Sequence, residues 1–520
     1  MRSWEFHRDL DPDAPQPLFV QLVRAITDDI AGGRLTPGQR LPGSRTLARS
    51  LGVHRNTVLA AYSELAAEGW IVTRVAQATV VADMPPSLAP PRAAVPGAAG
   101  YDLPAPADPH APSRYPPGTL ILARAAPDIR LLPARELAAA YRRVLLRHGS
   151  SLLFYGDAQG HPRLREALAT MLTETRGIAA RRDTVLVTRG SQMAIDVIAR
   201  LLVAPGDRVA VEAIGHPLVW AALRRAGAEL VPVPVDRDGL DVAALARALA
   251  VRPIRALHVT PHHQFPTTAV MPAARRRELL ALARTHRFAI VEDDYDHEFH
   301  FEARPVSPLA SADPAGVVIY VGTLSKILAP GLRLGFVVAP PPVIERLVAV
   351  RVGIDIQGDH AIECAVADLF EDGEVQRHVR RMRQVYHARR DALVTALRRE
   401  LPDAVDVNVP AGGMALWARV AEAIDIDAWA AAGLEHGVAF RGARYYDLGG
   451  AALPYTRLSF TFQSEPELAE AVRRMARALG SAGSRREASS DAGRARRLTD
   501  RARSLRSGAR GPGTRQARRA

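Results

Sequence analysis

The chain has 520 residues, of which 48% are hydrophobic and 24% charged, so about three domains of ~150 residues with packed cores fit its length. It contains no apolar run of about 18 residues and no apolar stretch after Met1, which argues against a membrane span and a secretory signal. The one cysteine, Cys364, excludes an internal disulfide. We therefore expect a cytoplasmic protein with no membrane partner.

The net charge of +13 is concentrated at one end of the chain. Residues 481–520 contain twelve arginines and three acids, so the rest of the chain carries little excess charge. This composition predicts a disordered basic tail. It also makes the high isoelectric point weak support for nucleic-acid binding by the folded part.

Residues 16–82 have the layout of a winged helix-turn-helix, a DNA-binding domain. Apolar residues repeat at helical spacing from Leu18, Ser44 is expected to cap a short helix, a second helix runs from about Arg55, and two short strands follow. The residues expected to contact double-stranded DNA are Arg45, His54, Arg55, Asn56 and Thr57. The alternative is a small packing or dimerisation bundle, in which these polar residues only cap a helix.

Residues 83–118 are rich in Pro and Ala and predict a linker. From 119 to 480, β-branched runs alternate with amphipathic stretches such as Gln192–Leu202 and Ala273–Thr285. This alternation predicts a mainly parallel, doubly wound α/β sheet. The expected strands are Thr184–Val187, Arg208–Val211, Leu230–Val233, Ala256–Val259, Phe288–Val291 and Val317–Val321.

Lys326 is the only lysine among 68 basic residues. Arginine stays protonated, whereas a desolvated lysine amine can lose its proton and form a Schiff base. Lys326 follows an expected strand, and the carboxyl ends of strands in an open α/β sheet face the ligand crevice. Its position therefore favours a role in amine chemistry over the alternative, in which Lys326 is an ordinary surface lysine that was kept by chance.

Two further segments carry candidate site residues. Thr188–Gln192 joins a strand to a helix through Gly190, a turn that offers backbone N–H groups to an anion, although ordinary capping also explains it. Val291–Glu298 places several acids and His297 after another strand, where one carboxylate could pair with a protonated ring nitrogen. A metal site, with His300 as a further ligand, is weighed and not assigned, because strand-end geometry lets only one or two of these side chains converge.

Together these elements resemble the type I pyridoxal-phosphate fold of aminotransferases, and Tyr155–Gly160, Ala204–Val209 and Thr260–Thr267 strengthen the resemblance. The segments Leu41–Arg45 and Gly52–Val58 resemble a GntR-type winged helix. The pairing resembles the MocR/GabR subfamily of GntR-type transcription regulators over roughly residues 16–480. It implies a winged helix-turn-helix followed by a large aminotransferase-like α/β domain with a small C-terminal α+β subdomain.

The resemblance implies pyridoxal 5'-phosphate as the cofactor, held as an internal aldimine by Lys326. Asp293 would pair with the pyridine nitrogen, with the adjacent Asp294 left open, and Tyr295 would bond the ring hydroxyl. His216 stands where the family stacks a tyrosine on the ring. Arg457 matches the arginine that binds an amino-acid carboxylate, with a surface salt bridge as the alternative. The expected phosphate ligands are Ser191, Gln192, Thr323, Ser325 and Arg333.

Two departures from the family pattern stand out. Thr268 replaces the glycine of a Pro-Thr/Ser-Gly motif, and the wing segment Val75–Thr79 lacks its usual glycine turn. The leading hypothesis is a regulator that senses pyridoxal phosphate or an amino-acid or amine effector through Lys326, as a head-to-tail homodimer. The rival is a working aminotransferase with an accessory DNA-binding module; a regulator would perform at most a slow transamination half-reaction.

Overall fold

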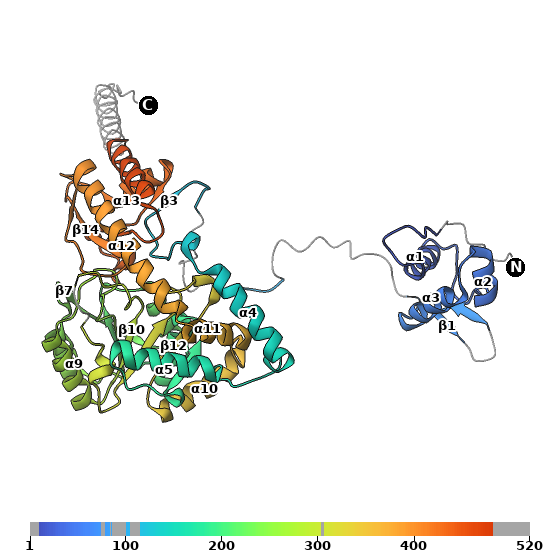
Figure 1. Ribbon diagram of the computed structural model, residues 1–520, viewed down its shortest axis with the longest axis horizontal. Helices are drawn as coiled ribbons and strands as arrows, with labels where there is room; N and C mark the ends of the chain where they lie inside the picture. Colours follow the sequence, from blue (N-terminus) through green and yellow to red (C-terminus); the bar gives the residue numbers. More distant parts are fainter. Residues whose placement is uncertain are drawn as a thin grey trace, which may run out of the picture. The chain divides into compact units, whose positions relative to one another are not determined.

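The computed structural model describes residues 10–73, 78–83, 85, 100–103, 115–302 and 306–481. The chain divides into two compact units, Met1–Ala107 and Asp108–Ala520 (Figure 1). Most of the expected linker (83–118), nearly all of the expected tail (481–520) and the wing residues 74–77 lie outside the described residues. Within the described part of the chain, no helix is long and apolar enough to cross a membrane.

The described residues of the N-terminal unit form three helices and a two-stranded antiparallel sheet, as the sequence predicts. Its core contains Leu22, Ile26, Val58 and Leu65, which no solvent reaches. The elements are α1 (Leu18–Ala31), α2 (Ser44–Leu51), α3 (Arg55–Ala67), β1 (Ile71–Thr73) and β2 (Thr79–Val81).

The turn between α2 and α3 is built from local backbone preferences. Gly52 ends α2 with a φ of 65°, a left-handed conformation that glycine adopts without a steric cost. His54 caps α3, because its Nδ1 accepts a hydrogen bond from the Asn56 N–H. The expected cap at the start of α2 is wrong: Ser44 is the first helical residue, and Gly43 is the cap and offers no side chain.

A seven-stranded sheet forms the centre of the large unit, in the order β4-β12-β11-β10-β9-β5-β6. All neighbouring pairs are parallel except those of β12, which runs antiparallel to both neighbours. The strands are β4 (Val185–Thr188), β5 (Arg208–Glu212), β6 (Glu229–Val233), β9 (Ala256–Val259), β10 (Ala289–Asp294), β11 (Val318–Thr323) and β12 (Gly335–Val338). The mainly parallel sheet is confirmed, and β12 is the strand that the sequence analysis missed.

Helices cover both faces of this sheet. Val291, Ile319 and Val321 pack with α6, α7 and α10, whereas Ile290, Val318 and Tyr320 pack on the other face against the remaining helices of this layer. The helices are α4 (Ala134–His148), α5 (Pro162–Arg176), α6 (Ser191–Leu202), α7 (Pro217–Arg225), α8 (Val242–Val251), α9 (Ala273–His286), α10 (Pro341–Asp355) and α11 (His360–Glu371).

The small C-terminal α+β subdomain is present as expected. The long helix α12 (Glu374–Glu400) leads into a three-stranded antiparallel sheet of β13 (Val405–Val407), β14 (Ala415–Val420) and β16 (Tyr455–Ser459). Trp429 of α13 (Ile426–Glu435) is fully buried in its core. A last helix runs from 465 to the end of the described residues at 481.

The remaining elements are short. β3 (Leu120–Ile121) pairs with β15 (Val438–Ala439), and β7 (Val235–Asp236) pairs with β8 (Gly239–Leu240). Short 3-10 helices occupy Ile129–Leu131, Gly149–Leu152, Arg182–Thr184, Leu309–Ala312, Pro330–Leu332 and Ala443–Tyr446.

Candidate cofactor site and DNA-binding surface

Lys326 lies three residues beyond the end of β11, at the carboxyl edge of the sheet. Its Nζ donates a hydrogen bond to the Ala125 carbonyl at 2.7 Å. Burial and, to a smaller extent, the nearby positive charge of Arg457 lower the pKa of this amine to about 8, against the opposing effect of Asp293 and Asp296. Roughly a tenth of Lys326 is therefore an uncharged nucleophile at pH 7, far more than for a lysine with the usual pKa of 10.5.

Asp293 and Asp294 are adjacent in β10, so their side chains point to opposite faces of the sheet. Asp293 interacts electrostatically with Lys326, and its buried Oδ1 has no hydrogen-bond partner. Asp294 accepts hydrogen bonds on Oδ2 from the Tyr320 hydroxyl at 2.7 Å and from His297 at 2.8 Å. The carboxylate with an open oxygen on the side of the lysine is therefore Asp293.

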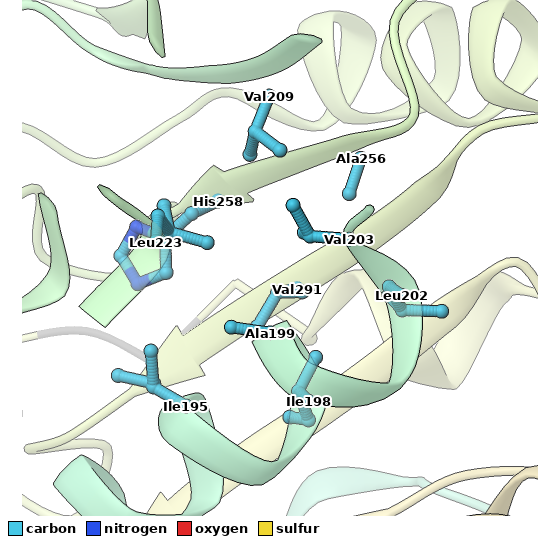
Figure 2. A pocket seen from close by; sticks show the side chains of 10 residues that line it. All are labelled: Ile195, Ile198, Ala199, Leu202, Val203, Val209, Leu223, Ala256, His258 and Val291. Carbon is cyan, nitrogen blue, oxygen red and sulfur yellow. The ribbon is translucent and has the colours of Figure 1, made fainter. Parts of the chain in front are cut away.

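Behind Asp293 lies His258, which the sequence analysis did not single out. Its Nε2 is 3.6 Å from Asp293 Oδ2, which is too long for a hydrogen bond. His258 closes one end of an apolar pocket between α6, α7 and the sheet (Figure 2). The cavity measures about 10 Å³, so it holds at most about one water and is not a ligand site.

His216 and Tyr295 both contact the ring of Phe265. His216 caps α7, and its ring centroid is 4.8 Å from that of Phe265. Burial lowers the pKa of His216 to about 4, so the ring is neutral at pH 7 and can lie against another flat ring. The Tyr295 hydroxyl donates to the His263 carbonyl at 3.1 Å.

Gly190 and Arg333 form a cradle at the start of α6. The Arg333 guanidinium donates to the Arg189 carbonyl at 2.9 Å, directly over Gly190, whose φ is 79°. A Cβ on Gly190 would lie 2.9 Å from an Arg333 nitrogen, so only glycine leaves room for the guanidinium. The half-buried Ser191 opens the helix beside them. Free backbone N–H groups, a hydroxyl and a guanidinium together suit a phosphate.

The other expected phosphate ligands, Thr323, Gln192 and Ser325, differ in the hydrogen bonds that their side chains form within the protein. Thr323 Oγ1 donates to the Leu334 carbonyl at 3.3 Å and accepts from the Ser325 N–H at 3.1 Å, so it holds the turn that carries Lys326. Gln192 Nε2 donates to the Leu218 carbonyl at 3.1 Å, which ties α6 to α7. The Ser325 side chain is half-buried. All five residues remain predictions as phosphate ligands.

Arg457 projects from β16 of the small sheet and is buried, with 3% of its surface exposed. Its guanidinium carbon lies 4.7 Å from the centre of the Phe265 ring, and its Nε has no partner. The residue is therefore no surface salt bridge. It brings a buried positive charge from the small subdomain into the environment of Lys326.

The expected DNA-contacting residues gather at the starts of α2 and α3. Arg45, Arg55 and Asn56 are exposed, and Arg55 Nε donates to Ser44 Oγ at 3.4 Å, which links the two helix starts. His54 is exposed but acts as the helix cap, and the Thr57 N–H donates to its carbonyl at 3.0 Å. Capping therefore accounts for His54 but leaves the side chains of Arg45 and Asn56 facing solvent.

Comparisons with known proteins agree with both halves of the chain. Residues 18–81 match the family described as "Bacterial regulatory proteins, gntR family", and residues 126–475 match "Aminotransferase class I and II". The "Probable rhizopine catabolism regulatory protein MocR" of Rhizobium meliloti is 35% identical over 81% of this chain and 86% of its own length. The chain belongs to the MocR type of GntR regulators.

Further relatives of this MocR-type chain include regulators and aminotransferases. The transcriptional regulator TauR of Rhodobacter capsulatus is 32% identical, over 90% of this chain and 98% of its own. The crystal structure of the α-aminoadipate aminotransferase LysN from Thermus thermophilus superposes with a TM-score of 0.66 and 30% identity, covering 71% of this chain and 94% of that chain. The chain is thus a DNA-binding transcription regulator whose large domain binds pyridoxal phosphate.

The site fits this cofactor on its own chemistry. Lys326 is an amine with a lowered pKa, Asp293 offers a buried oxygen without a partner, and Gly190 leaves the space that Arg333 needs for a phosphate. When bound, pyridoxal phosphate supplies an aldehyde that reacts with amines and a ring that withdraws electrons. Sequence reasoning missed Ala125 because it contributes only a backbone carbonyl. It missed His258 and Phe265 because their roles depend on neighbours that are distant in sequence.

Proposed function

We propose that this regulator senses pyridoxal phosphate, or an amino acid or amine that reacts with it, through Lys326. One observation carries the proposal. The Lys326 amine follows the large sheet, the buried Arg457 guanidinium belongs to the small sheet, and the two groups are close enough for their charges to interact. A ligand that engages both positions would bridge the two sheets and favour one arrangement of the large unit over others.

Each residue of the proposed site has its own role in binding the cofactor or the effector. Lys326, with a pKa of about 8, holds or releases a proton at Nζ near neutral pH. Asp293 presents an oxygen for a protonated ring nitrogen, and Arg333 with the start of α6 orients a phosphate. Arg457 would bind an effector carboxylate, since its guanidinium is buried and its Nε has no hydrogen-bond partner.

The test uses the full-length protein with an operator selected from a randomised DNA pool. An amino-acid panel is screened for ligands that change both the cofactor spectrum and the DNA affinity. For the Arg457→Ala variant we expect loss of the response to carboxylate-bearing effectors with the cofactor retained. The matched control is Arg419→Ala, which removes an exposed arginine from the neighbouring strand β14. An unchanged response in the Arg457 variant would refute the carboxylate role.

We also propose that the regulator acts as a head-to-tail homodimer. Five apolar side chains are exposed on two neighbouring segments, residues 153–156 and 354–357. The segments are held together by a hydrogen bond from the Gly156 N–H to Gln357 Oε1. The five side chains are Leu153, Phe154, Tyr155, Ile354 and Ile356, with exposures of 75%, 72%, 70%, 42% and 50%. A patch of this kind suits a second copy of the chain. Analytical ultracentrifugation should find dimers for the wild type and monomers for Phe154→Ser; dimers in both would contradict this interface.

Turnover separates regulation from the rival enzymatic function. A regulator performs at most a slow half-reaction, whereas an aminotransferase must cycle with a keto-acid acceptor. Sustained turnover with an amino acid and a keto acid would favour the enzyme. The fused GntR domain is the observation that favours regulation.

A further inference from the structure

A buried group of metal-ligating side chains lies on the face of β10 opposite Asp293. It consists of His262 after β9, Asp294 at the end of β10 and His297 three residues further on. One donor atom from each lies within 4.8 Å of the other two, and all three residues are at most 4% exposed. The segment Val291–Glu298 contributes Asp294 and His297, and His262 comes from the loop that follows β9, the strand beside β10.

The hydrogen-bonding of this group is incomplete. His262 has no partner on either ring nitrogen, and His297 Nε2 and Asp294 Oδ1 have none either. Buried polar atoms are nearly always satisfied, because each unpaired one costs about 1–3 kcal/mol. Each of the three neighbouring side chains therefore has at least one buried donor atom free to bind a shared ligand.

The protonation states suit a metal cation. His297 Nδ1 lies 2.8 Å from Asp294 Oδ2, so it can donate its proton there and leave the Nε2 lone pair free. His262 is buried and has no hydrogen-bond partner on either ring nitrogen, so its neutral ring can offer the lone pair of one nitrogen. Asp294 Oδ1 is buried and has no hydrogen-bond partner, so this oxygen is open to a cation.

The surrounding charges leave room for a cation. The positive charge of Arg176 is close enough to interact with Asp294. However, Arg176 already forms an ion pair with Glu298 and donates a hydrogen bond to the Tyr320 hydroxyl. Arg276 lies on the same side and faces Glu292 at 3.9 Å. These acids offset the two arginines, so Asp294 adds a negative charge that a cation can neutralise.

We propose that His262, Asp294 and His297 bind a divalent first-row transition metal, with Zn²⁺ as the best fit. Two imidazoles and one carboxylate are a ligand set that suits zinc and its neighbours rather than calcium or magnesium. Ligands at about 2.0–2.1 Å from a tetrahedral metal lie roughly 3.4 Å apart, so the three side chains must close by up to about 1.5 Å on binding. The site shares β10 with Asp293 but lies on the other face of the sheet.

Zinc uptake by the full-length, cofactor-loaded protein tests the proposal. After removal of metals with a chelator, Zn²⁺ is titrated in competition with a chromophoric chelator. We expect one strong site per chain in the wild type, and an affinity at least about 100-fold lower in His262→Gln and Asp294→Asn. The matched control is His286→Gln, at the exposed end of α9, which should bind like the wild type. The cofactor spectrum reports that each variant is folded.

Two results would overturn the proposal: no strong zinc site in the wild type, or equal affinity in His262→Gln and His286→Gln. X-ray absorption at the zinc edge of the wild type supplies a test that needs no variant. It should report two imidazole nitrogens and at least one carboxylate oxygen around the metal. A shell without imidazole would contradict the assignment even if the substituted proteins failed to fold.

Discussion

Replacing Gly190 by alanine should weaken the binding of pyridoxal phosphate through its phosphate alone. The new Cβ would lie 2.9 Å from an Arg333 nitrogen, and the backbone φ is 79°. The guanidinium is the flexible end of a side chain, so it would move away and leave the cradle. Loss of a charged hydrogen bond to the phosphate costs about 1.5–3 kcal/mol, or about 10- to 100-fold in affinity.

The left-handed backbone adds a separate cost that does not depend on ligand. With a ψ of 170°, Gly190 lies in a region that other residues rarely adopt, so an alanine there should lower the free energy of unfolding by about 1–3 kcal/mol. Gly331→Ala is the matched control, because Gly331 lies in the loop after Lys326 and a Cβ there meets nothing within 4 Å.

Comparing pyridoxal phosphate with pyridoxal isolates the phosphate. Equilibrium titration of each apoprotein with both compounds should show Gly190→Ala losing affinity for pyridoxal phosphate while its affinity for pyridoxal stays within a few-fold of the control. If Gly190→Ala discriminates between the two compounds as well as Gly331→Ala does, Arg333 and the start of α6 are not the phosphate site.

Three further predictions follow from single residues. Thr268 has a φ of 63°, a left-handed conformation that strains a threonine. Thr268→Gly should therefore stabilise the protein by about 0.5–1 kcal/mol in urea unfolding, because the relief of strain exceeds the entropy that glycine adds to the unfolded chain. Destabilisation would contradict this prediction. Lys326 has a pKa of about 8, so the rate of pyridoxal phosphate uptake by the apoprotein should rise with pH and level off above about 8, whereas a rise continuing toward 10.5 would show an ordinary lysine. Asn56→Ala should weaken binding to the selected operator about 10- to 100-fold in fluorescence anisotropy. It should leave non-specific DNA binding unchanged, because His54 still caps α3 and the helix stays intact. Equal losses of affinity on both DNAs would refute base recognition by Asn56.

Much of the fold could be predicted because buried strands have a clear pattern. Val318–Thr323 is rich in β-branched residues and Ala256–Val259 is a short, mainly apolar run, and both are strands of the large sheet. The strand β12 was missed because Gly335–Val338 is short and directly follows the loop that carries Lys326. The end of β10 was placed too early, since Glu292, Asp293 and Asp294 are polar residues in a buried strand.

The site was only partly predictable, and the reason is three-dimensional. Lys326 stood out because it is the only lysine. The choice between Asp293 and Asp294 needed the sheet, because adjacent strand residues face opposite sides and only their neighbours tell which side holds the lysine. The burial of Arg457 against Phe265 and the approach of His262 to His297 join segments far apart in sequence. No local pattern encodes such contacts.

The most direct test of the central claim measures operator affinity while pyridoxal phosphate is added to the full-length protein. For the wild type we expect the cofactor to change the affinity for the selected operator. For Lys326→Ala we expect no change, with the same affinity as the cofactor-free wild type, since the variant keeps the DNA-binding unit intact. An equal response in the two proteins would contradict sensing through Lys326.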